Sequence, residues 1–363
     1  MPRIVGSHGR YELLVDGKPY LILGAQVNNS SNYPATLPKV WPAIAQMHAN
    51  TVVMPIAWEQ IEPKEGAFDF SFLDLFLTQA REHGLHAMLL WFGTWKNGSP
   101  AYTPQWVKLH DARFPRVVDP HGRRMPSLSP LAQATLDADR AAFVALMRHL
   151  KAVDPQHTVI MVQVENETGT YGSVRDYSTR AQRLFEGSVP QQLVRALRTR
   201  EGTWRQVFGA QADELFHAWN IARFVQQVAA AGKAVYPLPM YVNAALRDPL
   251  HPGPTITYES GGPTDDALSV WKAGAPAIDV IAPDIYMPDY ARYLKVLDLY
   301  HRPDNALFVA ETASEPSYAR YLFATLGHQG IGFSPFGIDF TGYSNYPLGA
   351  REVDSRTLAP FAL

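Results

Sequence analysis

The sequence predicts an α/β fold, specifically a (β/α)₈ barrel. Eight short apolar runs alternate with helical patterns along the chain, which is the signature of an α/β protein. The runs are continuously apolar, as expected for parallel strands that are buried on both faces. Eight repeats favour a closed barrel over an open doubly wound sheet. No GxGxxG or P-loop motif follows the first run, which disfavours a nucleotide-binding fold.

The first expected element is a β-hairpin over residues 11–23, because Asp16 and Gly17 form a two-residue turn signal between two apolar runs. We expect this hairpin to lead into the first barrel strand and to close the bottom of the barrel. The eight expected strands cover residues 21–26, 51–58, 85–92, 157–166, 234–243, 277–286, 306–311 and 330–336. The helices expected between them cover residues 39–49, 71–84, 131–151, 213–232, 265–273, 291–301 and 317–329.

Two features of the helices are also predicted. Ser71 is the expected N-cap of the second helix, and Gly84 is expected at its C-terminal end. The eighth helix is expected to begin near Asp354 or Ser355 and to be short, because few residues follow. We therefore expect one barrel domain over residues 1–363, either with a stunted last helix or as the N-terminal part of a longer protein.

Composition limits the function. The chain has 363 residues, of which 47% are hydrophobic, so it can bury a large core. A formal net charge of −2 gives no electrostatic footprint for nucleic acid or an anionic membrane. The absence of cysteine excludes disulfides, thiolate catalysis and thiolate metal sites. The sequence lacks an apolar run of about 18 residues and an obvious signal peptide. It leaves open a cytoplasmic location, or a periplasmic or secreted one after signal removal, and the oligomeric state.

Two carboxylates stand where apolar strands end. Glu167 closes the fourth strand and Glu311 closes the seventh, and barrel active sites lie at these strand ends. A charge is costly at a buried strand end unless a partner or a function holds it there. Two facing carboxylates are what glycoside hydrolysis requires, one as acid/base and one as nucleophile. The alternative is that both are structural and lie in salt bridges.

The Asn-Glu pair at residues 166–167, together with the strand-seven Glu, resembles clan A of the glycoside hydrolases. That resemblance implies that Glu167 is the acid/base and Glu311 the nucleophile. It also implies that Asn166 binds the sugar 2-hydroxyl and that Tyr286, at the end of strand six, donates to the nucleophile.

A more specific resemblance is to family 35 of that clan, the β-galactosidases, because residues 163–167 read QVENE. The block WEQIEP at residues 58–63 is similar to families 35 and 42. Further matches indicate a bacterial branch of family 35 that includes xyloglucan-active enzymes, in which a β-rich region follows the barrel; this region is expected to be absent here. The matching stretches are residues 91–97, 260–263 and 282–286.

The resemblance implies a retaining exo-β-galactosidase that acts on oligosaccharides or plant polysaccharide side chains. The chain departs from the family after strand three, where Lys96 and Asn97 stand near the place of a galactose-binding Glu. We expect Lys96 and Asn97 to bind the sugar instead, since an ammonium and an amide offer donors. The alternatives are another clan A β-glycosidase, either a β-glucosidase or an endo-glycanase, and an inactive carbohydrate-binding barrel.

Three further residues are candidate sugar contacts. Asn28 follows strand one, Asn243 ends strand five, and Trp58 offers an indole face. Core packing or local turn formation is the alternative for each of them. The histidines form no HExxH or HxH pattern, so no catalytic metal and no cofactor are predicted. The expected partner is a carbohydrate substrate, with no nucleic acid and no membrane.

Overall fold

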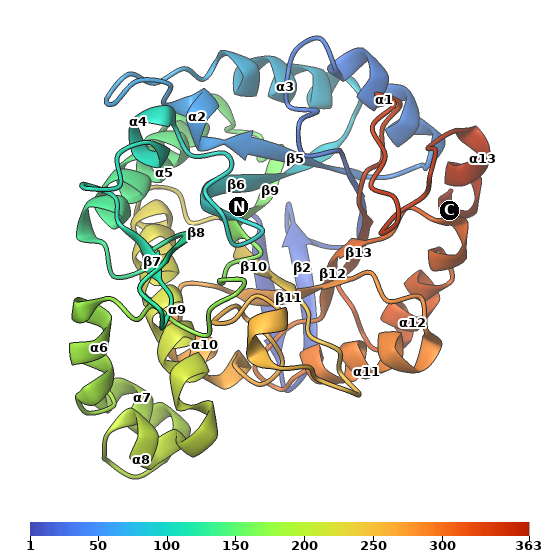
Figure 1. Cartoon of the computed structure of the whole chain (residues 1–363). Helices are drawn as coiled ribbons and strands as arrows, with labels where there is room; N and C mark the ends of the chain where they lie inside the picture. The colour runs from blue at the N-terminus through green and yellow to red at the C-terminus, as the bar shows by residue number, and fades with distance from the viewer. Residues whose placement is uncertain (363) are drawn as a thin grey trace.

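The computed structural model describes residues 1–362 and has a closed eight-stranded parallel barrel at its centre (Figure 1). The strands follow one another round the barrel in chain order, and the last strand pairs with the first. This confirms the predicted fold. The barrel strands are β4 (Ile22–Gln26), β5 (Thr51–Ala57), β6 (His86–Lys96), β9 (Val159–Asn166), β10 (Met240–Ala245), β11 (Val280–Ile285), β12 (Phe308–Thr312) and β13 (Gly332–Pro335).

Helices surround the barrel on its outside, between consecutive strands (Figure 1). No helix within residues 1–362 combines the length and hydropathy that a membrane span needs. The main helices are α1 (Leu37–Gln46), α3 (Ser71–Glu82), α5 (Gln133–Val153), α9 (Ala212–Val235), α10 (Leu268–Gly274), α11 (Tyr290–Tyr300), α12 (Tyr321–Gly327) and α13 (Ser355–Leu358).

Two predicted boundaries are wrong. Ser71 is the first residue of α3 rather than its N-cap, and its backbone N–H donates to Asp69 Oδ1 at 2.9 Å. The fifth strand begins only at Met240, because α9 continues to Val235. Pro237, which cannot continue a helix, follows directly after that end.

The N-terminal hairpin is present as predicted and belongs to a three-stranded antiparallel sheet, made of β1 (Arg3–Ser7), β2 (Arg10–Val15) and β3 (Lys18–Tyr20). Leu13 and Val15 of β2 pack into the same buried cluster as the barrel-interior side chains of Met88 and Phe308. The hairpin therefore closes the end of the barrel opposite to the carboxyl ends of the strands. Side chains fill the interior, so the barrel is a packed core and not a pore.

Long connections follow β6 and β9, and the sequence did not predict the elements inside them. After β9 three short helices form a projecting group at the side of the barrel (Figure 1). The connection after β6 contains α4 (Gln105–Lys108), β7 (Arg116–Val118) and β8 (Arg124–Leu128), and that after β9 contains α6 (Thr179–Glu186), α7 (Gln191–Leu197), α8 (Trp204–Phe208) and the 3₁₀ helix η1 (Gly209–Gln211). Four short elements lie elsewhere: α2 (Trp58–Ile61) after β5, and the 3₁₀ helices η2 (Thr255–Thr257) after β10, η3 (Pro316–Tyr318) after β12 and η4 (Ala359–Phe361) after α13.

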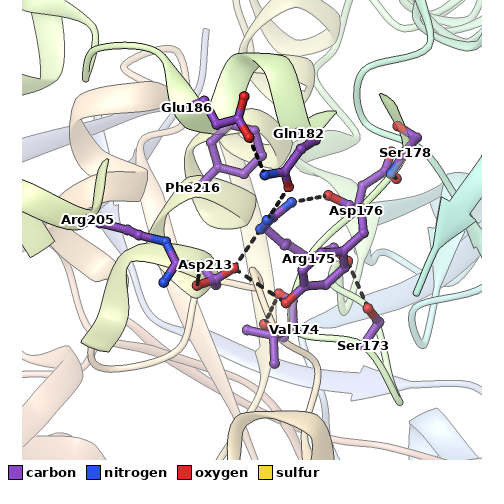
Figure 2. Close-up of polar contacts among 12 residues, drawn as sticks. Ser173, Val174, Arg175, Asp176, Ser178, Gln182, Glu186, Arg205, Asp213 and Phe216 are labelled. Carbon is purple, nitrogen blue, oxygen red and sulfur yellow. Dashed lines mark hydrogen bonds and ion pairs between the residues drawn. The ribbon is translucent and has the colours of Figure 1, made fainter. Parts of the chain in front are cut away.

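A buried arginine anchors the projecting helices to the barrel (Figure 2). Arg175 is 1% exposed, and its guanidinium lies 3.9 Å from the ring centre of Tyr177 and 4.0 Å from that of Phe185. Its Nε donates to Asp213 Oδ1 of α9 at 2.6 Å, and a second nitrogen donates to Gln182 Oε1 of α6 at 2.8 Å. The planar guanidinium thus joins α6, α9 and the loop that follows β9.

Candidate functional site

A pocket of about 370 Å³ opens at the carboxyl ends of the barrel strands. Seven of the eight barrel strands contribute lining residues, either from the strand itself or from the loop directly after it; β5 does not. This is the end of the barrel at which active sites of this fold lie. The lining residues are Asn29, Lys96, Asn97, Glu167, Tyr171, Ala245, Leu246, Asp284, Tyr286, Met287, Glu311, Phe336, Asn345 and Leu348.

Glu311 lines this pocket and is surrounded by hydrogen-bond donors. Gln26 Nε2 donates to its Oε1 at 2.8 Å, and Tyr286 Oη donates to its Oε2 at 2.7 Å. Asn166 Nδ2 makes a longer contact of 3.4 Å with Oε1. Three donors from three different strands stabilise a negative charge on a side chain that is only 3% exposed.

Glu167 faces Glu311 across the pocket. One carboxylate oxygen of each lies within 4.8 Å of the other. Burial raises the pKa of Glu167 to about 7; Lys96 acts to lower this pKa, and the negative charge of Glu311 adds to the rise. Lys96 Nζ lies 3.7 Å from Glu167 Oε2, and Asn97 Nδ2 donates to the same oxygen. The two facing carboxyl groups therefore have different surroundings, one rich in neutral donors and one desolvated beside a cation.

A third carboxyl group, Asp284, completes the cluster. Asn243 Nδ2 donates to Asp284 Oδ2 at 2.7 Å, while Asn243 Oδ1 accepts from the backbone N–H of Glu167 at 2.9 Å. Burial raises the pKa of Asp284 well above its ordinary value, and the charges of Glu311 and Glu167 raise it further. One buried amide thus connects the backbone of Glu167 to the side chain of Asp284.

The backbone at the end of β9 departs from a regular strand. The register between β6 and β9 shifts between Trp91 and Lys96, as in a β-bulge, and both Glu165 and Glu167 have positive φ, at 65° and 45°. Such backbone is strained for residues with a Cβ and is typical of functional sites. The bulge requires Gly93, since a Cβ there would lie 2.4 Å from Trp91 Nε1. The bulge places Lys96 opposite Asn166, beside the pocket.

Behind the bulge lies a second pair of carboxyl groups. Glu165 and Asp139 are fully buried beside Gly93, burial raises the pKa of both, and the charge of Asp139 raises the pKa of Glu165 further. Trp91 Nε1 and the Thr94 backbone donate to Asp139, and the Trp95 N–H donates to Glu165. Glu165 therefore supports the backbone of β6 from behind the pocket.

The cluster of Glu167, Asp284 and Glu311 brings three carboxylate oxygens close enough to face one cation. Hard divalent cations take six or more oxygen ligands, so three carboxylates alone would leave such an ion incompletely coordinated. The ammonium of Lys96 already supplies a fixed positive charge beside Glu167. The proposed chemistry therefore uses the side chains themselves, namely the carboxyl groups of Glu167 and Glu311 and the amide, phenol and ammonium groups that contact them.

Three of the predicted sugar contacts have protein partners in the structure, and their contact with a sugar stays a prediction. Trp58 is fully buried, its Nε1 donates to Glu62 Oε2 at 2.8 Å, and it packs edge-on against Trp106 rather than lining the pocket. The Asn28 side chain donates to Asp339 Oδ1 at 2.9 Å and joins two loops. Asn243 uses both ends of its amide on Glu167 and Asp284, as described above. Protein partners thus occupy the Trp58 N–H and both ends of the Asn243 amide, whereas Asn28 Oδ1 is buried without a donor.

The structure gathers the remaining predicted residues at the pocket, namely Glu167, Glu311, Asn166, Tyr286, Lys96 and Asn97. Sequence reasoning missed Gln26, Asn29 and Asp284. Gln26 and Asp284 stand at strand ends, the signal that singled out Glu167 and Glu311, so the same rule would have found them. It also missed Glu259, a fully buried carboxyl group with no hydrogen-bond partner for either oxygen, whose pKa is raised well above its ordinary value by burial.

Comparison with known proteins gives a family match. The model of a β-galactosidase family, glycoside hydrolase family 42, matches residues 35–234. A β-galactosidase of Xanthomonas manihotis is 28% identical over 180 residues, which cover 47% of this chain and 27% of that protein. These matches support a clan A β-galactosidase, but the match is to family 42 and does not support the family 35 that the sequence motifs resembled.

Solved structures show the same fold. The β-galactosidase from Bacillus circulans sp. alkalophilus has a TM-score of 0.66 and 13% identity, covering 96% of this chain and 56% of that one. The β-galactosidase from the psychrophilic Marinomonas ef1 has a TM-score of 0.64 and 13% identity, covering 93% and 58%. The chain thus spans little more than half the length of these structures and about a quarter of the Xanthomonas protein.

Proposed function

Because the chain belongs to the β-galactosidase family, glycoside hydrolase family 42, we propose that it hydrolyses terminal β-D-galactosides as a retaining, exo-acting enzyme with one catalytic barrel domain. The observation that carries this proposal is the pairing of Glu311 with Glu167, whose nearest oxygens lie within 4.8 Å of each other. Retaining enzymes hold their carboxyl groups about 5–5.5 Å apart, whereas inverting enzymes leave room for a water molecule at about 6.5–9.5 Å.

In the first step, Glu311 attacks the anomeric carbon and the bond to the leaving oxygen breaks. Gln26 and Tyr286 donate to the two oxygens of Glu311 and so hold its carboxylate in one orientation. Glu167 gives its proton to the leaving oxygen. A pKa of about 7 suits this role, because a substantial fraction of Glu167 is protonated at neutral pH and the group is still acidic enough to transfer its proton.

In the second step, Glu167 is ionised and acts as a general base. It takes a proton from water, whose oxygen attacks the anomeric carbon and releases Glu311. Lys96 at 3.7 Å and the amide of Asn97 stabilise the negative charge that Glu167 carries at this stage. We assign them both this role and contact with the sugar, since both line the pocket.

The substrate assignment follows from the family and from the size of the pocket. A volume of about 370 Å³ lies at the low end of the range for small-molecule sites, about 300–1,000 Å³, and suits one or two sugar rings better than a long polymer. Asn166, whose Oδ1 is buried without a donor, is proposed to accept a hydrogen bond from the sugar 2-hydroxyl. Phe336 offers an apolar wall.

Azide rescue tests the mechanism. We expect Glu311→Gly to lose turnover of nitrophenyl β-galactoside, and added azide to restore it with formation of the α-galactosyl azide. Glu167→Ala should retain activity on substrates with good leaving groups and yield the β-azide. Glu165→Gln serves as a control for an acidic residue that lies next to the site but outside it.

The stereochemistry of the azide products decides the roles. If the two variants gave the opposite adducts, the assignments of Glu167 and Glu311 would be reversed. Nuclear magnetic resonance of the first-formed sugar from the natural enzyme would show the β-anomer for a retaining reaction, and an α-anomer would exclude it. A panel of nitrophenyl glucosides, fucosides and xylosides tests whether galactose is the preferred sugar.

A further inference from the structure

Among the described residues that line the pocket, Asp284 is the one carboxyl group to which the proposed reaction gives no role. It is 3% exposed and stands at the end of β11, in register with Glu311 on β12. Its Oδ2 accepts from Asn243 Nδ2. Its Oδ1 is buried and has no donor facing it from any residue that the structure describes. A buried carboxylate oxygen in this position is costly unless it carries a proton itself.

The group that faces Asp284 is Glu167. One carboxylate oxygen of Asp284 lies within 4.8 Å of one of Glu167, and two carboxyl groups that share a buried site cannot both be ionised without a large electrostatic cost. We propose that Asp284 is a neutral acid whose Oδ1–H donates to Glu167, so that Asp284 is a positioning residue for the acid/base. This inference deepens the proposed function and rests on it.

The charges around Asp284 favour the neutral form. Glu167 faces it from the end of β9, and Glu311 faces it from β12. Lys96, from β6, acts in the opposite direction and lowers the pKa of Asp284, but it pairs directly with Glu167. Burial raises the pKa of the phenols of Tyr241 and Tyr286, and a negative charge on Asp284 would raise both further, so these two side chains are neutral.

The donor has a function in the reaction cycle. When Glu167 is ionised in the second step, a hydrogen bond from Asp284 is charge-assisted and therefore stronger than in the first step. It stabilises the ionised general base and fixes its orientation towards the incoming water. Asn243 supports this arrangement, because it holds the Asp284 side chain and the Glu167 backbone with a single amide.

A comparison of Asp284→Asn with Asp284→Ala tests the proposal. An asparagine amide reproduces the neutral acid, with its oxygen towards Asn243 and its NH₂ towards Glu167, so we expect kcat/KM within about threefold of the natural enzyme and an unchanged pH profile. Alanine has no donor, and we expect a loss of about 10- to 100-fold, the size measured for hydrogen bonds to charged groups.

The loss in Asp284→Ala should fall on the second step. With dinitrophenyl β-galactoside, whose leaving group needs little acid assistance, we expect kcat to fall and the initial burst of dinitrophenolate to grow. A loss confined to KM, or variants that both match the natural enzyme, would overturn the proposal. So would an Asp284→Asn variant in which the alkaline limb of the pH profile moves to lower pH, because that shift is the sign of a lost negative charge.

Infrared spectroscopy gives a result that does not depend on activity or on the folding of the alanine variant. We expect the difference spectrum between the natural protein and Asp284→Asn at pH 7 to contain the C=O stretch of a protonated carboxyl group. Its absence would refute a neutral Asp284. If the natural protein hydrolysed none of the glycosides while this band was present, the proposed function would fail and the protonation state of Asp284 would stand.

Discussion

Replacing Lys96 with methionine should move the alkaline limb of the pH profile. Lys96 Nζ lies 3.7 Å from Glu167 Oε2, and both side chains are 8% exposed. Coulomb's law at this distance gives about 4.5 kcal/mol at an effective dielectric constant of about 20, and about 1.1 kcal/mol in bulk water. At about 1.4 kcal/mol per pKa unit, loss of the cation should raise the pKa of Glu167 by about 1 to 3 units.

The direction in which the alkaline limb moves follows from the role of Glu167 as the acid. Its proton is needed for the first step, so activity is present below its pKa and is lost as the pH rises through it. The natural enzyme should lose kcat/KM above about pH 7, where the pKa of Glu167 lies, and Lys96→Met should retain it to a pH about 1 to 3 units higher.

The assay is kcat/KM across pH with a substrate that has a poor leaving group, such as lactose, because acid assistance then limits the rate. Lys96→Arg is the matched control, since it keeps the charge and should leave the limb near its natural position. An alkaline limb that does not move in Lys96→Met would refute the electrostatic reasoning. A limb that moves to lower pH would show that the effect of Lys96 on Glu167 is opposite to the one proposed.

Three other substitutions test the support around the site. Tyr286→Phe removes a 2.7 Å hydrogen bond to Glu311, and we expect kcat/KM to fall about 10- to 100-fold with little change in the unfolding midpoint in urea. Gly93→Ala brings a Cβ to 2.4 Å from Trp91 Nε1, and we expect the free energy of unfolding to fall by about 1–3 kcal/mol; unchanged stability would show that the bulge can relax. Arg175→Met removes a buried cation and should lower the unfolding free energy by about 3–5 kcal/mol, and its projecting helices should become the first site of proteolysis; equal resistance to protease would contradict the anchoring role.

The order of the barrel strands could be predicted because each strand is a continuous apolar run with a helix after it. The strand-end rule also singled out Glu167 and Glu311, since a carboxylate next to a buried run is conspicuous in the sequence. Gln26 and Asp284 meet the same rule, but the sequence does not show which neighbour a strand-end amide or acid faces. Their partners, Glu311 and Glu167, come from other strands.

The sequence could not show which candidate sugar contacts already have protein partners. Trp58 and Asn243 were expected to bind sugar because their side chains can do so, but the sequence does not show whether a protein group already satisfies them. Trp58 donates to Glu62 four residues away, and both ends of the Asn243 amide are occupied. Likewise, the helices α6 to α8 depend on contacts with α9 and Arg175, which local sequence patterns do not reveal.

The closure of the barrel by β13 against β4 has a consequence for how the protein matures. These strands come from opposite ends of the chain, and the Phe336 N–H that follows β13 donates to Thr312 O, one residue after Glu311. A nascent chain that lacks β13 therefore exposes two unpaired strand edges and has an incomplete pocket wall beside Glu311. Galactoside turnover should thus appear on the ribosome only once the last strand has left the exit tunnel.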